Sequence, residues 1–242
     1  MRQRFIELLP DRKGGKRGPR PIAKEVLAEG LFLRLRYNVC WEDIPHGYTV
    51  WRYFQELQRS GFFSRTILEL IGDKKRPAKL VIDSTNVNTY HGVSMSKYNG
   101  KYHNDCIKFT LAMTEDDKVV DFIISKGSMH DSKILDTFLS KKSFILPYEL
   151  FLDKGYENYS RRRVLKKQNC QVRMQQKNYA KNKKRGPRFL FSSSHSKTRT
   201  SVEKNFAYLK AFASFKFCKY KSLKSLKSHI LAILLIFTLS HS

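Results

Sequence analysis

The chain has 242 residues, of which 41% are hydrophobic, enough for one substantial core or for one core with a small helical attachment. Its formal net charge is +26. Self-repulsion on this scale favours a polyanionic partner, so nucleic acid is the first candidate, and a basic, highly soluble protein without such a partner is the alternative. The Lys and Arg residues are spread over the whole chain instead of lining one amphipathic helix, which argues against a membrane-surface role.

The four cysteines lie far apart in the sequence, at Cys40, Cys106, Cys170 and Cys218. They form no C-x-x-C pair and no histidine lies at zinc-finger spacing, so neither a disulfide framework nor a structural zinc site is indicated. The N-terminal residues contain no apolar stretch of signal-peptide length, and the longest apolar run is about half of a membrane span. We therefore expect a protein of the reducing cytoplasm with no membrane partner.

Residues 1–75 are predicted to form a small all-helical domain. Apolar residues at helical spacing follow Pro21, which suits the first turn of a helix. Thr49 is expected to cap a second helix, and a third helix is expected after Gly61. Short helices with basic connections are typical of a helix-turn-helix-like DNA-binding unit, although small helical bundles without that role are common. The basic arm RKGGKRGPRP at 12–21 either contacts DNA or is solvated.

Residues 76–242 are predicted to form a second domain with a mixed α/β sheet. Short runs rich in apolar, β-branched and aromatic residues predict strands at 79–83, 106–113, 118–125, 148–153 and 170–174. Helical spacing predicts helices at 134–139, after Asn158, from Thr198 onward and at 222–239. The last of these helices is expected to pack on the sheet, because its apolar part is short for a membrane span.

Two aspartates stand at the ends of predicted strands: Asp83 in VIDST and Asp153 in FLDKGYE. A carboxylate that follows a buried strand emerges at the end of the sheet, which is where open α/β sheets place their binding sites. Either residue could instead cap a helix or form a turn.

Glu203 is the last acidic residue of the chain and lies in a strongly basic region. On a helix, Arg199, Glu203 and Lys210 project from one face, and the cationic neighbours favour the ionised carboxylate. Three ionised carboxylates, those of Asp83, Asp153 and Glu203, are what a site for two Mg²⁺ ions requires in phosphodiester chemistry. The alternative is that Glu203 only forms surface salt bridges with Arg199 and Lys210.

The ordered motifs resemble those of bacterial insertion-sequence DDE transposases, the group that spans insertion sequence families four and five. The spacing R-x3-E-x6-K, formed by Arg199, Glu203 and Lys210, is similar to the signature around the catalytic glutamate of that family. VIDSTNVNT and LDKGYEN resemble the regions with its first and second catalytic aspartates, and GSMHDSK, CWEDIPHGY and VWRYFQELQRSGFF resemble further segments. The family signature usually begins with a Tyr three residues before the Arg, where this chain has Ser196.

The resemblance implies an RNase H-like mixed sheet flanked by helices, in which Asp83, Asp153 and Glu203 hold two Mg²⁺ ions, with Mn²⁺ as the alternative metal. It further implies DNA strand cleavage at the inverted-repeat ends of a transposon and transfer of the 3′-hydroxyl into target DNA. Arg199 and Lys210 would contact the phosphates of the transposon end.

Two further groups of residues are candidates for this site. The basic segment after residue 180 is expected to contact DNA through Lys181, Lys183, Lys184 and Arg185. His130 and Asp131 are secondary candidates near the metal ions, although a cap on the helix at 131–140 explains Asp131 equally well.

The expected partner is double-stranded DNA, both the transposon ends and the target, bound by a homo-oligomer because two ends must be cut together. The expected location is the bacterial cytoplasm, in association with the nucleoid. An inactive or truncated transposase copy, or a Mg²⁺-dependent nuclease, is the alternative with the same fold. A non-enzymatic basic regulator that binds DNA or RNA is the alternative from another class.

Overall fold

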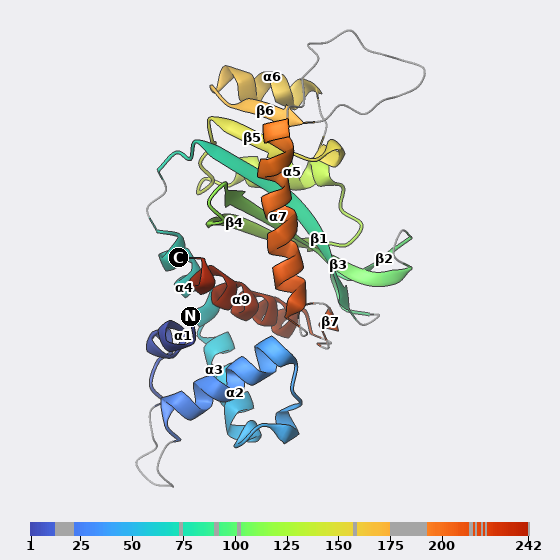
Figure 1. Cartoon of the computed structure of the whole chain (residues 1–242). Coiled ribbons are helices and arrows are strands. Elements are labelled where there is room, and N and C mark those ends of the chain that lie inside the picture. Colours follow the sequence, from blue (N-terminus) through green and yellow to red (C-terminus); the bar gives the residue numbers. More distant parts are fainter. Residues whose placement is uncertain are drawn as a thin grey trace. The chain divides into compact units, whose positions relative to one another are not determined.

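The computed structural model of the chain divides into two compact units (Figure 1). One unit comprises Met1–Gly72, Val87–Ser94 and Tyr208–Ser242, and the other comprises Asp73–Asn86 and Met95–Ala207; we call them the helical unit and the sheet unit. The structure describes residues 1–12, 22–72, 75–89, 92–100, 103–156, 159–174, 193–212, 215, 217, 218, 220 and 222–241.

The sheet is mixed and its strands run in the order β2-β3-β1-β5-β6, with β4 paired to β3 and β7 paired to β1. The strands are β1 (Lys79–Thr89), β2 (Lys97–Asn99), β3 (Asn104–Thr114), β4 (Val119–Lys126), β5 (Glu149–Leu152), β6 (Gln171–Met174) and β7 (Phe217–Cys218). The β3–β4 pair is an antiparallel hairpin, whereas β1, β5 and β6 are parallel neighbours. This arrangement confirms the predicted mixed α/β sheet.

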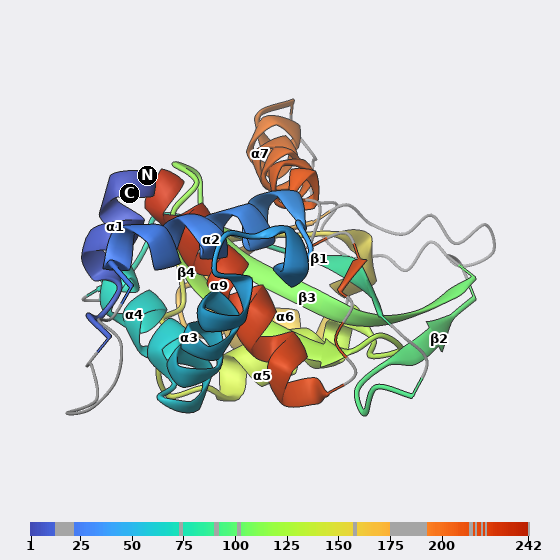
Figure 2. The same ribbon diagram turned by 90° about the horizontal axis from the view of Figure 1, so that it is seen from below.

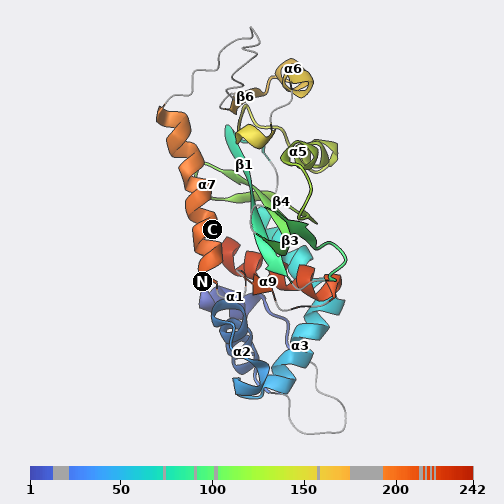
Figure 3. The same cartoon turned by 90° about the vertical axis from the view of Figure 1, so that its right-hand side faces the viewer.

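Helices cover both faces of the sheet within the sheet unit. Helices α5 (Asp131–Ser140) and α6 (Tyr159–Lys167) lie on one face, and the part of α7 (Ser193–Ala211) in this unit lies on the other face (Figure 3). Alternate residues of β1 and β5 are buried in one cluster with apolar residues of α5: Leu80, Ile82, Leu150, Leu152, Ile134, Leu135 and Phe138. Because side chains alternate along a strand, the intervening residues of β1 and β5 point to the face that α7 covers.

The helical unit contains five described α-helices that each bury an apolar face (Figure 2). They are α1 (Arg2–Leu8), α2 (Lys24–Tyr37), α3 (Gly47–Arg59), α4 (Phe62–Ile71) and α9 (Leu223–Ser240). The predicted capping role of Thr49 is wrong, because α3 begins at Gly47 with His46 as its N-cap. A Cβ atom at Gly47 would lie 1.6 Å from the Trp41 carbonyl oxygen, so the sharp entry into α3 requires glycine.

Helix α9 is the one described helix that is long and apolar enough to cross a membrane by length and composition, and 61% of it is buried. Within its unit the helix contacts α1, α2 and α4, as Figure 2 also shows. Its predicted packing on the sheet stays a prediction. Its apolar side chains surround the helix and are buried on nearly all sides. The grouping of Tyr208–Ser242 with the N-terminal helices therefore differs from the predicted division at residue 75.

Candidate active site

Asp83 and Asp153 lie beside each other where the parallel pairing of β1 with β5 ends. The last paired residues of β1 and β5 are Ile82 and Leu152, and each aspartate follows directly. Both residues are half-buried. The Ser84 backbone N–H donates to Asp83 Oδ1 at 2.8 Å, which holds that carboxylate in one orientation. Neighbouring parallel strands point the same way, so the residues that follow their paired segments lie at the same end of the sheet. The sheet therefore brings the two carboxylates together.

Asp83 belongs to the series of β1 side chains that points toward α7. It alternates with Ile82, whose side chain lies in the cluster under α5. The Asp83 carboxylate is therefore on the face of the sheet opposite α5, where α7 lies (Figure 3).

Glu203 is an exposed residue of α7, the helix on this same face. Two residues that flank it in sequence anchor the helix to the β3–β4 turn. The Ser201 hydroxyl donates to Asp117 Oδ1, and Asn205 Nδ2 donates to the same oxygen at 2.6 Å. Asp117 has a left-handed backbone conformation with φ 64°, which aims its carboxylate at the helix. We call these three residues the α7 clamp.

The structure thus brings two of the three predicted metal-binding carboxylates together and places the third on the helix that covers them. Within the described part of the chain, no group of three or more His, Cys, Asp or Glu side chains is close enough to bind one metal ion. The proximity of Glu203 to Asp83 and Asp153 therefore stays a prediction.

A hydrogen-bonded network lies on the other face of the sheet, directly behind the two aspartates. The Ser84 hydroxyl is 2.7 Å from the Tyr156 hydroxyl and 2.8 Å from Thr110 Oγ1. Tyr156 is only 2% exposed, and this burial raises its pKa well above the ordinary value. The negative charges of Asp131, Asp83 and Asp153 raise the pKa further, against the lowering effect of the Ser84 hydrogen bond. The Tyr156 hydroxyl consequently stays protonated.

Asp131, a secondary candidate from the sequence, lies close enough to this network for its charge to raise the pKa of Tyr156. Lys108 Nζ donates to Asp131 Oδ1 at 3.0 Å and to the Met129 carbonyl at 2.7 Å. The N-cap of α5 is the exposed His130, which makes no side-chain capping bond, and Asp131 is the first residue of the helix. The alternative that Asp131 caps the helix is therefore wrong, and its carboxylate pairs with Lys108 instead.

Gly155 gives the Asp131 carboxylate room to lie against the turn after β5. A Cβ atom at residue 155 would lie 2.5 Å from Asp131 Oδ2, and Lys108 holds that carboxylate in place. We expect Gly155→Ala to destabilise the protein by about 1–3 kcal/mol through this clash. Urea denaturation measures the change, with Gly100→Ala as the control because no atom lies within 4 Å of its added Cβ. Equal stability of the two variants would contradict the packing of Asp131 on Gly155.

The predicted DNA-binding cations are only partly described. Lys210 is an exposed residue of α7, and Arg199 and Ser196 lie in the same helix, where only their place in the helix is described. Lys181, Lys183, Lys184 and Arg185 lie outside the described residues.

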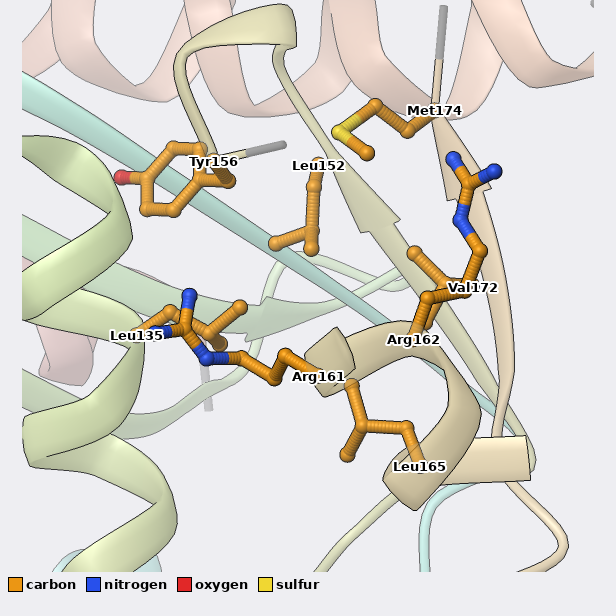
Figure 4. A pocket seen from close by; sticks show the side chains of 8 residues that line it. All are labelled: Leu135, Leu152, Tyr156, Arg161, Arg162, Leu165, Val172 and Met174. Carbon is orange, nitrogen blue, oxygen red and sulfur yellow. The ribbon is translucent and has the colours of Figure 1, made fainter. Parts of the chain in front are cut away.

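A small cavity lies between α5, α6 and the strands β5 and β6 (Figure 4). Its lining residues are Leu135, Leu152, Tyr156, Arg161, Arg162, Leu165, Val172 and Met174. Its volume is about 10 Å³, which is the size of one water molecule, so the cavity is a packing defect and not a ligand site. In Figure 4 the Tyr156 hydroxyl points away from Leu152 and Met174.

A mixed sheet of this strand order, covered by helices on both faces and with two carboxylates where the pairing of two central parallel strands ends, defines the class of RNase H-like α/β folds. The chain belongs to the family described as "Transposase DDE domain", whose model matches residues 74–239. Curated proteins give no match to the chain.

One solved transposase structure shares the fold. The piggyBac transposase synaptic complex with hairpin DNA is 10% identical and matches with a TM-score of 0.63, over 97% of this chain and 70% of that chain. The Mos1 transposase paired-end complex with the left transposon end is 12% identical and matches over 96% of this chain and 82% of that chain, with a TM-score of only 0.29.

Sequence reasoning missed four polar residues that the fold places around the aspartates: Ser84, Lys108, Thr110 and Tyr156. Ser84 and Tyr156 lie within the two aspartate motifs, VIDST and LDKGYEN. Their position inside these motifs is the sequence feature that could have identified Ser84 and Tyr156 as site residues.

Proposed function

We propose that the chain is a DNA transposase that cuts strands at the ends of its transposon and joins the freed 3′-hydroxyl to target DNA. The observation that supports this most directly is the register of β1 and β5, which pairs Ile82 with Leu152, the residues directly before Asp83 and Asp153. Family membership supports the same conclusion, because the family is defined by a transposase DDE domain.

The donor set of the site fits a hard divalent cation. Asp83, Asp153 and Glu203 offer carboxylate oxygens, the ligands that Mg²⁺ and Mn²⁺ prefer. We propose that these three residues hold two Mg²⁺ ions, with Mn²⁺ as the alternative. When bound, such ions activate the attacking water or hydroxyl and stabilise the leaving oxygen of the phosphodiester.

The protein's own groups have distinct roles in this proposal. The Ser84 N–H orients the Asp83 carboxylate, and the α7 clamp holds the helix segment with Glu203 on the face of the aspartates. The Lys108 ammonium balances the charge of Asp131, the carboxylate nearest to the turn after Asp153.

Cations outside the carboxylate site would bind DNA. Arg199 and Lys210 would contact transposon-end phosphates from α7, and the basic segment from Lys181 to Arg185 would add further contacts. The net charge of +26 supports a strongly salt-dependent association with double-stranded DNA. Cutting two ends together would require a homo-oligomer on the DNA.

Strand cleavage with purified protein tests this function. The substrate is a duplex with the inverted repeats that flank the gene, and the expected result is Mg²⁺-dependent nicking at the repeat ends. Cleavage no greater than that of Asp83→Ala would contradict the enzymatic function and favour an inactive, DNA-binding copy. Equal cutting of unrelated DNA would favour a nuclease.

A further inference from the structure

One side-chain hydrogen bond joins the segments that carry the two aspartates. The backbone pairing of β1 and β5 ends at Ile82 and Leu152, one residue before each aspartate. Beyond this point the Ser84 hydroxyl meets the Tyr156 hydroxyl at 2.7 Å. Ser84 follows Asp83 directly, and Tyr156 closes the turn that begins at Asp153 by donating its backbone N–H to the Asp153 carbonyl at 3.1 Å. The Ser84–Tyr156 bond therefore connects the two carboxylate-bearing segments where the sheet no longer does.

We propose that Tyr156 is a positioning residue, whose hydroxyl fixes the separation of Asp83 and Asp153 through Ser84 and thereby sets the affinity of the site for divalent metal. This inference rests on the proposed function, because it assigns metal binding to the two aspartates. Residues that orient metal ligands in this indirect way commonly change metal affinity about 10- to 100-fold when they are replaced.

The surroundings of the Tyr156 hydroxyl fit a fixed connection. Thr110 of β3 holds the Ser84 hydroxyl from the other side at 2.8 Å, so Ser84 is shared between two strands and the turn. The Tyr156 side chain is buried, with an exposed fraction of 2%, which prevents water from replacing the bond. The close packing of Asp131 on Gly155, with Lys108 paired to Asp131, holds the turn itself.

A purely structural role for Tyr156 makes a different prediction from a positioning role. The ring lies in the cluster between the sheet and α5, where a phenylalanine ring would fill the same space. Tyr156→Phe removes only the hydroxyl and leaves Ser84 with its Thr110 partner. A structural role would therefore leave metal affinity unchanged in this variant, whereas a positioning role would not.

Direct metal binding by the full chain tests the inference without DNA. Electron paramagnetic resonance of free Mn²⁺ measures the affinity, and Asp83→Asn identifies the binding that depends on the proposed site. We expect Tyr156→Phe to weaken this affinity by about 10-fold, with Ser84→Ala similar. The double variant should be no weaker than either single variant, because both remove the same bond. Tyr148→Phe is the matched control, since Tyr148 is an exposed tyrosine of the same unit.

The outcomes separate this inference from the proposed function. Wild-type affinity in Tyr156→Phe, or no Asp83-dependent Mn²⁺ binding in the wild type, would overturn the positioning role. Weaker binding in Tyr156→Phe that is additive with Ser84→Ala would also overturn it, because the two hydroxyls would then act separately. Normal Mn²⁺ binding with no cleavage of transposon-end DNA would count against the proposed function and leave the positioning role intact. Melting temperatures of all variants should stay within a few degrees of the wild type.

Discussion

Replacement of Asp83 by Asn is expected to lower Mg²⁺-dependent cleavage of transposon-end DNA by about 10³-fold or more. Asn has nearly the same shape and keeps an oxygen for the Ser84 N–H, so β1 keeps its conformation around residue 83. The change removes the negative charge that a divalent cation needs at the centre of the site. Initial rates of strand nicking measure the loss. Asp153→Asn should lower the cleavage rate by a similar factor.

The matched control for this prediction is Asp136→Asn. Asp136 is an exposed aspartate of α5, the helix on the other face of the sheet, and it pairs with Arg161. Its loss should leave the rate within about twofold of the wild type, because α5, which carries Asp136, lies on the face of the sheet opposite α7. Comparable rates for Asp83→Asn and Asp136→Asn would exclude Asp83 from the metal site.

The second large effect is expected at the α7 clamp. Asp117→Gly removes the carboxylate that accepts hydrogen bonds from Ser201 and Asn205, and glycine adopts the observed φ of 64° without strain. Asn205 is buried, so its amide loses a partner that water does not replace, which costs about 1–3 kcal/mol of stability. The α7 segment between the two residues carries Glu203, and a shift of about 1 Å in a catalytic group lowers rates roughly 10²-fold.

Two companion variants identify the cause of that loss. Asp116→Gly makes the same change at the preceding turn residue, whose carboxylate pairs with Lys118, and it should cleave like the wild type. Asp117→Asn keeps an acceptor oxygen and a residue that tolerates the left-handed conformation, so it should recover most of the rate. If Asp117→Gly and Asp116→Gly have the same rate, the clamp does not position Glu203.

Local patterns in the sequence were sufficient to predict most strands and helices of the fold. The run KLVID predicted the start of β1, but the strand continues to Thr89 through STNVNT, whose polar residues are typical of a turn. Partner strands stabilise that extension, and a short strand such as β7 contains too few residues to give a pattern. The packing partner of α9 was unpredictable for a related reason: a helix that is apolar on nearly all sides has no face that indicates its neighbour.

The site was predictable as far as residue type and strand position allow. Because each acid follows an apolar run, the sequence predicted that Asp83 and Asp153 lie after the carboxyl ends of strands. Only the register of β1 and β5 showed that these two residues are neighbours. The role of Tyr156 could not be predicted, because its partner Ser84 is distant in the sequence and the two residues meet only in the folded chain. The ion pair between Lys108 and Asp131 could not be predicted for the same reason, because the two residues lie on β3 and α5.

In the proposed site, Glu203 joins Asp83 and Asp153 in binding metal. Fe²⁺ that replaces Mg²⁺ generates hydroxyl radicals in the presence of ascorbate and peroxide, and these cleave the polypeptide next to the bound metal. We predict cuts near residues 83, 153 and 203 of the wild-type chain, all suppressed by excess Mg²⁺ and by Asp83→Asn. Cuts near residues 83 and 153 with none near 203 would contradict the claim.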